Sequence, residues 1–203
     1  EIYRSQQLLI CAGAWANALS TQFGEPVPLV ARGPQMAVTE PVPYVFGSSM
    51  GVYTSIKEES VYFRQIPRGN IILGGGPPGP ADVATRRAGV LPINTVRQLA
   101  QFRRLVPAMT PLNVIRVWSG VESYLPDAEP IIGASSTTDG LFYGFGFSGS
   151  GFQTGPGVGE TLAELLDTGR TEIALEPFSV ARFARRASDA PLASADVFSP
   201  SEA

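Results

Sequence analysis

The pattern of hydrophobic and polar positions predicts β-strands over much of the first half of the chain. The clearest case is a hairpin in which Val61–Ile66 and Asn70–Leu73 are joined by the turn Pro67–Gly69. Residues 29–76 as a whole combine short apolar runs with turns rich in proline and glycine. This part of the chain is therefore predicted to form a β-sheet.

Apolar residues three or four positions apart predict helices over Ala14–Phe23 and Asn94–Leu105. A further helix is expected after residue 150, with Thr154 as its N-cap and Pro156 in its first turn. The last residues, 188–203, are rich in Ala, Ser, Asp and Pro and lack periodicity, so we expect disorder there.

The first apolar run lies at the start of the chain, where Gln6–Trp15 is typical of a buried strand followed by a turn of small residues. Such a strand needs a neighbour on each side, so its position predicts that further sequence precedes Glu1. Without that sequence, Leu8–Cys11 would expose apolar surface, and the isolated chain is expected to aggregate or oligomerise.

Composition narrows the possible classes of protein. With 203 residues, 44% of them hydrophobic, the chain can form one domain or two small ones with a core. The net charge of −3, without basic clusters, argues against nucleic-acid binding. No apolar run is long enough for a transmembrane helix and no signal peptide is recognisable, so we expect a cytoplasmic protein. The single cysteine, Cys11, is expected to be a buried and unreactive thiol.

The chain contains no histidine. Hydrolases with a Ser-His-Asp or Cys-His arrangement are therefore excluded, and no metal site is expected. Lys57 is the only lysine, and it lies in a Lys-Glu-Glu run that is typical of a solvated loop. Catalysis would have to use carboxylates, Tyr, Arg, this one lysine or a cofactor.

The most distinctive segment is glycine-rich and lies between a strand-like and a helix-like sequence, at Gly144–Glu160. Gly144, Gly146 and Gly149 have the spacing G-x-G-x-x-G, but a dinucleotide fingerprint also needs a complete βαβ unit. No second apolar strand follows Gly169. A glycine-rich loop of another kind is favoured, which either contacts a ligand through backbone N–H groups or only packs tightly.

Several motifs occur in the order seen in flavin-dependent amine and amino-acid oxidoreductases. They are CAGAWA (Cys11–Ala16), RGPQ (Arg32–Gln35), YFRQ followed by IILGGG, WSGVESYLPDAEPIIG (Trp118–Gly133) and GLFYGFGFSGSGFQTGPGVGE. Over residues 5–185 the chain resembles the D-amino-acid oxidase-like superfamily, nearest to its sarcosine oxidase β-subunit and D-amino-acid dehydrogenase branch. The strand–GxGxxG–helix unit with which this family begins, and which holds the ADP part of FAD, is missing.

The resemblance implies an α+β or α/β fold, the C-terminal part of a two-domain flavoprotein. It would comprise a mixed β-sheet substrate domain and an incomplete Rossmann-like FAD-binding domain. The expected segments are a piece of the FAD-binding domain at 1–30, the substrate domain at 31–115, a C-terminal piece of the FAD-binding domain at 116–176 and a largely disordered tail at 177–203.

The resemblance also implies roles for particular positions. Small residues after the first strand would allow close approach of the cofactor, or would serve only a tightly packed turn. Backbone N–H groups after the glycine-rich turn would face the flavin pyrimidine edge, which becomes anionic on reduction. The implied cofactor-binding residues are Ala12, Gly13, Trp15, Gly149, Ser150, Gly151, Phe152 and Gln153.

Many relatives carry an arginine for the substrate carboxylate where this chain has Glu122, which argues against a simple α-amino acid substrate. Glu122 would meet a cationic substrate group or pair with an arginine such as Arg116. Arg64 is the remaining partner for a carboxylate, or an edge arginine that faces solvent. The implied substrate-binding residues are Tyr62, Arg64, Glu122 and Tyr124, and no catalytic residue is assigned.

The implied activity is oxidation of the CH–NH bond of a small amine or amino acid, by hydride transfer to N5 of non-covalent FAD and hydrolysis of the imine. One alternative is a catalytically incompetent remnant or subunit, an interaction module that needs a partner chain to complete the FAD site. Another is an unrelated enzyme with Asp127 and Glu129 as acid and base, although a Pro-rich turn with surface carboxylates also explains that pair.

Overall fold

The structure is a computed structural model that describes residues 2–109 and 111–187. The chain forms two compact units. The first unit is built from Glu1–Ala31 and Glu122–Ala203, and the second unit from Arg32–Val121. Each unit has its own hydrophobic core.

The first unit contains a three-stranded sheet with the order β1-β12-β11. Its strands are β1 (Leu8–Ile10), β12 (Leu141–Phe145) and β11 (Ile131–Ala134). β1 runs parallel to β12, and β11 runs antiparallel to it. Within the described residues β1 pairs with β12 alone, and Leu8 and Leu9 are 46% and 37% exposed. The strand predicted in the first part of Gln6–Trp15 is therefore present as Leu8–Ile10, but it lies at an edge and is partly exposed.

The predicted helix Ala14–Phe23 consists of three short pieces. They are the 3-10 helix η1 (Gly13–Trp15), the α-helix α1 (Ala16–Ser20) and the 3-10 helix η2 (Thr21–Phe23). The segment ends at Gly24, whose φ of 77° stops helical continuation. The short strand β10 (Glu122–Tyr124) also belongs to this unit and contacts η1.

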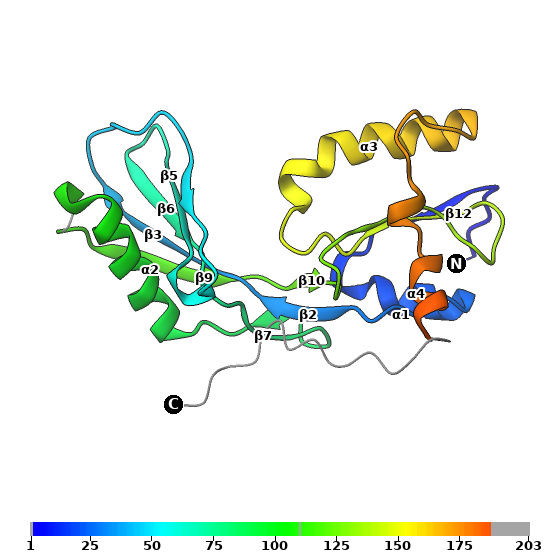
Figure 1. Ribbon diagram of the computed structural model, residues 1–203, viewed down its shortest axis with the longest axis horizontal. Helices are drawn as coiled ribbons and strands as arrows, with labels where there is room; N and C mark the ends of the chain where they lie inside the picture. The colour runs from blue at the N-terminus through cyan, green and yellow to red at the C-terminus, as the bar shows by residue number, and fades with distance from the viewer. Residues whose placement is uncertain (1, 110, 188–203) are drawn as a thin grey trace. The chain divides into compact units, whose positions relative to one another are not determined.

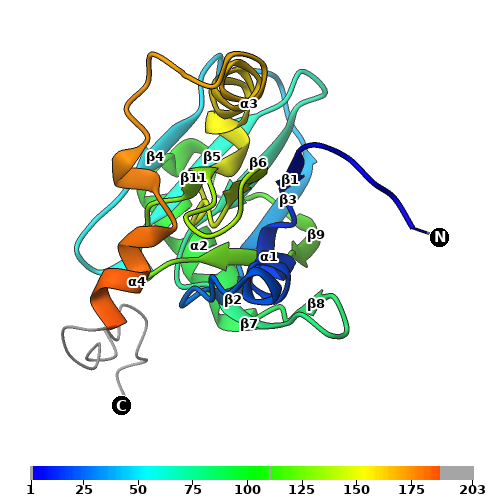
Figure 2. The same cartoon turned by 90° about the vertical axis from the view of Figure 1, so that its right-hand side faces the viewer.

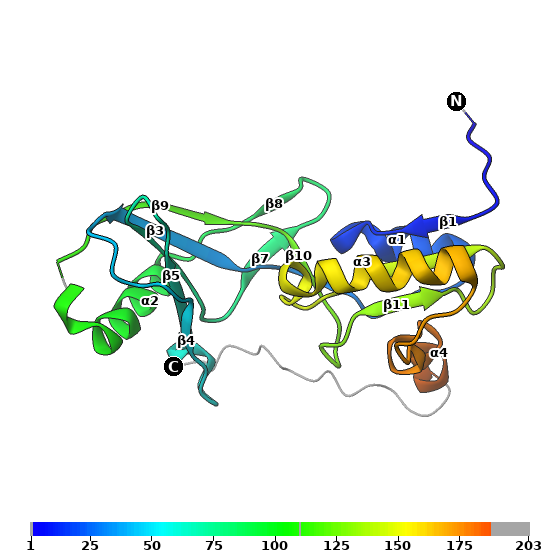
Figure 3. The same ribbon diagram turned by 90° about the horizontal axis from the view of Figure 1, so that it is seen from above.

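The long helix α3 (Gly151–Thr168) follows β12 and contacts β11 (Figures 1 and 3). The expectation that Thr154 is its N-cap is wrong, because the helix begins three residues earlier. Thr154 Oγ1 instead donates to the carbonyl oxygen of Ser150 at 2.9 Å, one turn back, and Pro156 lies inside the helix. A Cβ at Gly144 would lie 3.0 Å from Leu162 Cδ1, so this glycine permits the close packing of α3 on β12.

The C-terminal part of the described chain is folded against this core. After the 3-10 helix η5 (Glu176–Phe178) comes helix α4 (Ala181–Ala187), which is labelled in Figure 2. Phe183 of this helix belongs to one buried cluster with Tyr143 and Phe145. The expectation of disorder is therefore wrong for residues 177–187, because Val180 and Phe183 are buried in this core. Residues 188–203 lie outside the described residues.

The second unit contains a five-stranded antiparallel sheet with the order β4-β5-β6-β3-β9. Its strands are β3 (Gln35–Pro41), β4 (Met50–Val52), β5 (Val61–Gln65), β6 (Asn70–Gly74) and β9 (Val114–Ser119). The predicted hairpin is confirmed as β5 and β6. The sheet continues beyond residue 115, because β9 pairs along β3 up to Ser119.

Helix α2 (Pro92–Leu105) covers one face of this sheet (Figure 1). The ring of Phe102 meets that of Phe63 edge to face, with 4.9 Å between centroids. Along β5, Val61, Phe63 and Gln65 are buried and Tyr62 and Arg64 are exposed, which is the alternation expected of a half-buried strand. The remaining elements are β2 (Val30–Gly33), η3 (Lys57–Glu59), β7 (Gly79–Asp82), β8 (Arg87–Ala88) and η4 (Pro107–Met109).

Candidate functional site

The glycine-rich turn between β12 and α3 has an unusual backbone. Gly146, Ser148 and Gly149 have positive φ angles of 79°, 50° and 93°. A Cβ at Gly146 would lie only 2.5 Å from Leu125 Cδ1, so position 146 requires glycine for space as well as for conformation. Gly149 is exposed at the tip of the turn. The turn therefore presents bare backbone immediately before the helix.

Ser148 is held in its left-handed conformation by three hydrogen bonds. Its N–H donates to Ser123 O at 3.0 Å, its Oγ donates to Gly146 O at 3.3 Å, and Leu125 N–H donates to that Oγ at 3.2 Å. A non-glycine residue in this region costs on the order of 1–3 kcal/mol, which these bonds offset. No local sequence pattern marks Ser148, because its hydrogen-bond partners are brought to it by the fold.

The N-terminus of α3 is not capped by a side chain. Ser150 occupies the N-cap position, but its Oγ donates to Phe147 O at 2.6 Å and does not accept from the helix. The hydrogen bond from Thr154 N–H to Ser150 O is the first of the helical series at this end, so the N–H groups of Gly151, Phe152 and Gln153 lack an acceptor within the helix. The first turn contains no acidic residue. This end of the helix therefore favours a ligand with negative charge or acceptor atoms.

Two of the predicted substrate-binding residues lie beside this turn. Tyr124 Oη donates to Glu122 Oε2 at 3.1 Å, and a Cβ at Gly149 would lie 3.9 Å from that oxygen and 4.0 Å from Tyr124 Oη. The hydroxyl therefore orients the carboxylate next to the glycine-rich turn.

The first unit also holds the predicted cofactor-binding residues Ala12, Gly13 and Trp15. Trp15 N–H donates to Ala12 O at 3.0 Å, and Gly13 has a φ of 53° with open space where a Cβ would stand. All eight cofactor candidates lie in the first unit, together with Glu122 and Tyr124. Within this unit η1 contacts β10, the strand that carries Glu122 and Tyr124. The other two substrate candidates, Tyr62 and Arg64, lie on β5 in the second unit.

The carboxylate of Asp127 has a structural partner. Arg182 Nε donates to Asp127 Oδ2 at 2.9 Å, and other guanidinium nitrogens of Arg182 donate to backbone carbonyls, including that of Glu129 at 2.7 Å. Burial alone would raise the pKa of Asp127, but the hydrogen bond and the charge of Arg182 outweigh it and lower that pKa. This arrangement fixes α4 to the turn and favours a structural role for Asp127 over an acid–base role.

The buried carboxylate of Glu25 stabilises the turn between β11 and β12. Glu25 Oε2 accepts from Ser135 Oγ at 2.5 Å and Tyr143 Oη at 2.7 Å, and Oε1 accepts from the N–H and Oγ of Ser136 at 2.7 and 2.6 Å. Burial tends to raise the pKa of Glu25, but these hydrogen bonds lower it overall. The pKa of the Tyr143 hydroxyl is raised far above its usual value, mainly by burial. The hydrogen bond to Glu25 and the negative charge of Glu25 raise it further.

Cys11 is exposed, so the expectation of a buried thiol is wrong. The reason is that Cys11 follows the edge strand β1, where only its inner side packs; a Cβ at Gly144 would lie 3.1 Å from its sulfur. The partial burial that remains raises the pKa of this thiol, which therefore stays protonated near neutral pH.

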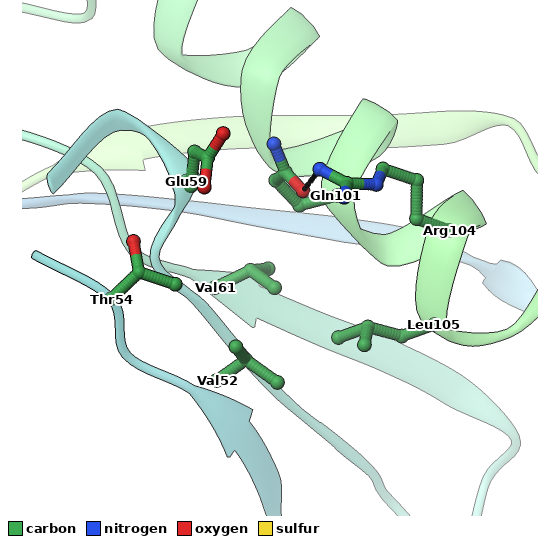
Figure 4. Close-up of a pocket in the computed structure, with 7 residues that line it drawn as sticks. All are labelled: Val52, Thr54, Glu59, Val61, Gln101, Arg104 and Leu105. Atoms are coloured by element: carbon green, nitrogen blue, oxygen red, sulfur yellow. Dashed lines mark hydrogen bonds between the residues drawn. The ribbon is translucent and has the colours of Figure 1, made fainter. Parts of the chain in front are cut away.

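The second unit contains a cavity of about 190 Å³ (Figure 4). It is lined by Val52, Thr54, Glu59, Val61, Gln101, Arg104 and Leu105. Since Val61 points to the α2 side of the sheet, this cavity lies on the face opposite Tyr62 and Arg64 and contains none of the predicted site residues. Over residues 2–109 and 111–187, no cluster of three potential metal ligands occurs, and no helix has the length and apolar character to cross a membrane.

Comparison with known proteins places the chain in a family. Residues 1–165 match the family of FAD dependent oxidoreductases called DAO, so the chain belongs to that family. Over 188 residues it is 28% identical to the mitochondrial sarcosine dehydrogenase of Homo sapiens, covering 89% of this chain and 20% of that protein. It is 27% identical over 177 residues to sarcosine oxidase subunit beta of Rhodobacter capsulatus, covering 87% and 41%. The solved structure of L-proline dehydrogenase from P. horikoshii is 28% identical with a TM-score of 0.74, covering 89% and 47%.

These similarities confirm the D-amino-acid oxidase-like resemblance and the mixed α/β flavoprotein fold that the motifs implied. FAD is the cofactor of this family. The chain spans less than half the length of each of these three relatives.

Proposed function

We propose that the chain is part of an FAD-dependent oxidoreductase that oxidises the CH–NH bond of a small amine or amino acid, with FAD bound non-covalently in a cytoplasmic enzyme. The observation that carries this proposal is the uncapped N-terminus of α3, reached by an exposed glycine turn with Glu122 and Tyr124 beside it. Membership of the FAD-dependent family supports it.

The residues present fit a flavin ring. The N–H groups of Gly151, Phe152 and Gln153 would donate to acceptor atoms at the ring edge, and the helix dipole would favour negative charge that develops there. Gly149 leaves the approach to these donors open. When bound, FAD would supply the acceptor for the hydride of the substrate.

Glu122 would bind the amine end of the substrate. Its Oε2 is held by Tyr124 at 3.1 Å, which leaves the other carboxylate oxygen to accept a hydrogen bond from a substrate ammonium group. In this role the Glu122 carboxylate pairs with a positively charged group of the substrate, at the position where many relatives bind the carboxylate of theirs. The amine, and not a carboxylate, is then the group of the substrate that this part of the site recognises.

The proposal includes a complementary polypeptide. The free side of β1 exposes Leu8 and Leu9 in the described structure, where β1 pairs with β12 alone. A partner segment that adds a parallel strand beside β1 would bury these side chains and supply the rest of the FAD site. The same free edge favours the second candidate function, an interaction module without activity of its own.

A flavin titration distinguishes the two functions. FAD is titrated into the 203-residue chain, alone and with a polypeptide that carries the strand–GxGxxG–helix unit of a β-subunit relative, while flavin fluorescence and absorbance are followed. The proposed enzyme binds FAD tightly only with its complement and is then reduced by an amine such as sarcosine in the absence of oxygen. Association of the two polypeptides without flavin binding supports the interaction module and rejects the enzyme.

A further inference from the structure

The cavity of the second unit lies where the C-terminal end of α2 meets the edge of the sheet. Its lining residues come from β4 and the loop beyond it, from η3, from the start of β5 and from α2 (Figure 4). All of these elements belong to the same unit. The volume of the cavity is about 190 Å³. Because an apolar cavity of about 150 Å³ holds benzene, this one has room for roughly seven or eight non-hydrogen atoms.

One side of the cavity is aliphatic. Val52 ends β4, Val61 begins β5 and Leu105 ends α2, and Figure 4 shows their side chains on the same side of the cavity. Val61 is fully buried, whereas Val52 and Leu105 are exposed, so the cavity opens to solvent there. A ligand that covers Val52 and Leu105 removes apolar surface from water, which favours a ligand with an aliphatic part.

The other side of the cavity carries two opposite charges. The half-buried Glu59 comes from η3, which contacts α2, and Gln101 and Arg104 come from α2 itself. Arg104 Nη1 donates to Gln101 Oε1 at 2.9 Å, which holds the guanidinium along this side (Figure 4). Within the described residues, the Glu59 carboxylate accepts no hydrogen bond and forms no ion pair, even with Arg104. This carboxylate and the other N–H groups of Arg104 can therefore bind a ligand.

We propose that this cavity binds a zwitterionic α-amino acid with a small, branched aliphatic side chain, of about the size of valine. The ammonium group of the ligand pairs with Glu59 and its carboxylate with Arg104, while its side chain contacts Val52, Val61 and Leu105. A ligand with a single charge would leave one of the two protein charges without a partner. No residue that is proposed to bind FAD or the substrate amine lines this cavity, so it is a second binding site.

Matched ligands test the proposal. L-valine, isovalerate and isobutylamine share the same branched aliphatic part, but isovalerate lacks the amine and isobutylamine lacks the carboxylate. Each is titrated into the 203-residue chain, and saturation-transfer NMR of the ligand methyl groups gives the dissociation constant. Isovalerate and isobutylamine should each bind about fivefold more weakly than L-valine, because each loses one partly exposed ion pair. Glycine keeps both charges but lacks the aliphatic part, and should bind about tenfold more weakly.

Two substitutions assign each charge of the ligand to its partner. Glu59→Gln should weaken the binding of L-valine and isobutylamine about fivefold and leave that of isovalerate unchanged. Arg104→Gln should weaken the binding of L-valine and isovalerate about fivefold and leave that of isobutylamine unchanged. Glu58→Gln and Arg103→Gln are the matched controls, because each changes a neighbouring residue that does not line the cavity. Thermal unfolding by circular dichroism shows that each variant is folded.

Absence of L-valine binding overturns the inference, as does equal affinity for L-valine and either of its singly charged analogues. A substitution of Glu59 or Arg104 that weakens all three ligands alike, or not at all, overturns it too. Glu122→Gln should leave L-valine binding unchanged, and a loss there would place the ligand at the proposed amine site instead. These measurements need no flavin, so their outcome is independent of the FAD titration.

Discussion

Replacing Glu25 by glutamine removes the charge from a buried carboxylate that accepts four hydrogen bonds. The backbone N–H of Ser136 can only donate, so the glutamine oxygen must take its place at that side. The glutamine NH₂ group then faces Ser135 Oγ and Tyr143 Oη, which have to rotate their hydroxyl groups and accept. The cluster can therefore persist in Glu25→Gln, but only with weaker, neutral hydrogen bonds.

The expected loss of stability follows from these contacts. Hydrogen bonds to a charged group contribute about 1.5–3 kcal/mol each and neutral ones about 1 kcal/mol, whereas the neutral amide is less costly to bury. We expect Glu25→Gln to lower the free energy of unfolding by about 2 kcal/mol, because the lower cost of burying the neutral amide offsets part of the loss of the charged hydrogen bonds. For a chain of this size, that corresponds to a decrease in Tm of roughly 4–8 °C.

Thermal unfolding at several pH values checks this reasoning, with Glu164→Gln as the control because Glu164 is exposed on α3. The hydrogen bonds lower the pKa of Glu25 in the folded protein. Its contribution is therefore complete above the unfolded pKa of roughly 4.3 and disappears as the pH falls through the folded value. The difference in Tm between wild type and Glu25→Gln should shrink below about pH 4. Equal Tm values at pH 7, or a difference that does not shrink in acid, would refute the account.

Three further substitutions have expected outcomes. Gly146→Ala should destabilise the protein by about 2 kcal/mol or more, because φ is 79° and the new Cβ would lie 2.5 Å from Leu125 Cδ1; an unchanged urea midpoint would contradict this. Arg182→Met should cost about 3 kcal/mol, measured by urea unfolding, since it leaves the Asp127 carboxylate partly buried without its cation. Phe102→Ala should cost about 3–5 kcal/mol and weaken the near-ultraviolet circular dichroism of the second unit, and a loss below about 1 kcal/mol would argue against α2 packing on the sheet.

The sequence predicted well those elements whose signals are local. The hairpin of β5 and β6 has a turn of Pro67–Gly69 between alternating strands, and α2 has regular apolar spacing, so both were found. The start of α3 was misplaced because Gly155 and Pro156 are typical of helix ends, whereas packing of Leu162 over Gly144 keeps the segment helical. The order in 177–187 was missed because Phe183 becomes buried only through contacts with distant strands.

For the candidate site, too, residues in local motifs were predicted, whereas arrangements that depend on the fold were not. Family motifs pointed to the residues around the glycine-rich turn and to Glu122 and Tyr124, which the structure places side by side. The sequence did not reveal that Arg64 and Arg116 lie on the same face of the five-stranded sheet, because this depends on the register of four strands. The roles of these residues toward flavin and substrate stay predictions.

The most direct test of the central claim, that the N-terminus of α3 holds the flavin, is the FAD affinity of Gln153→Glu together with the complementary FAD-binding polypeptide. Gln153 is exposed in the first turn, where an added carboxylate stabilises a helix by about 0.3–1 kcal/mol. The same charge would oppose the electron-rich edge of the flavin. The account predicts an FAD dissociation constant about tenfold higher at an equal or higher Tm. Unchanged FAD affinity in this variant would contradict it.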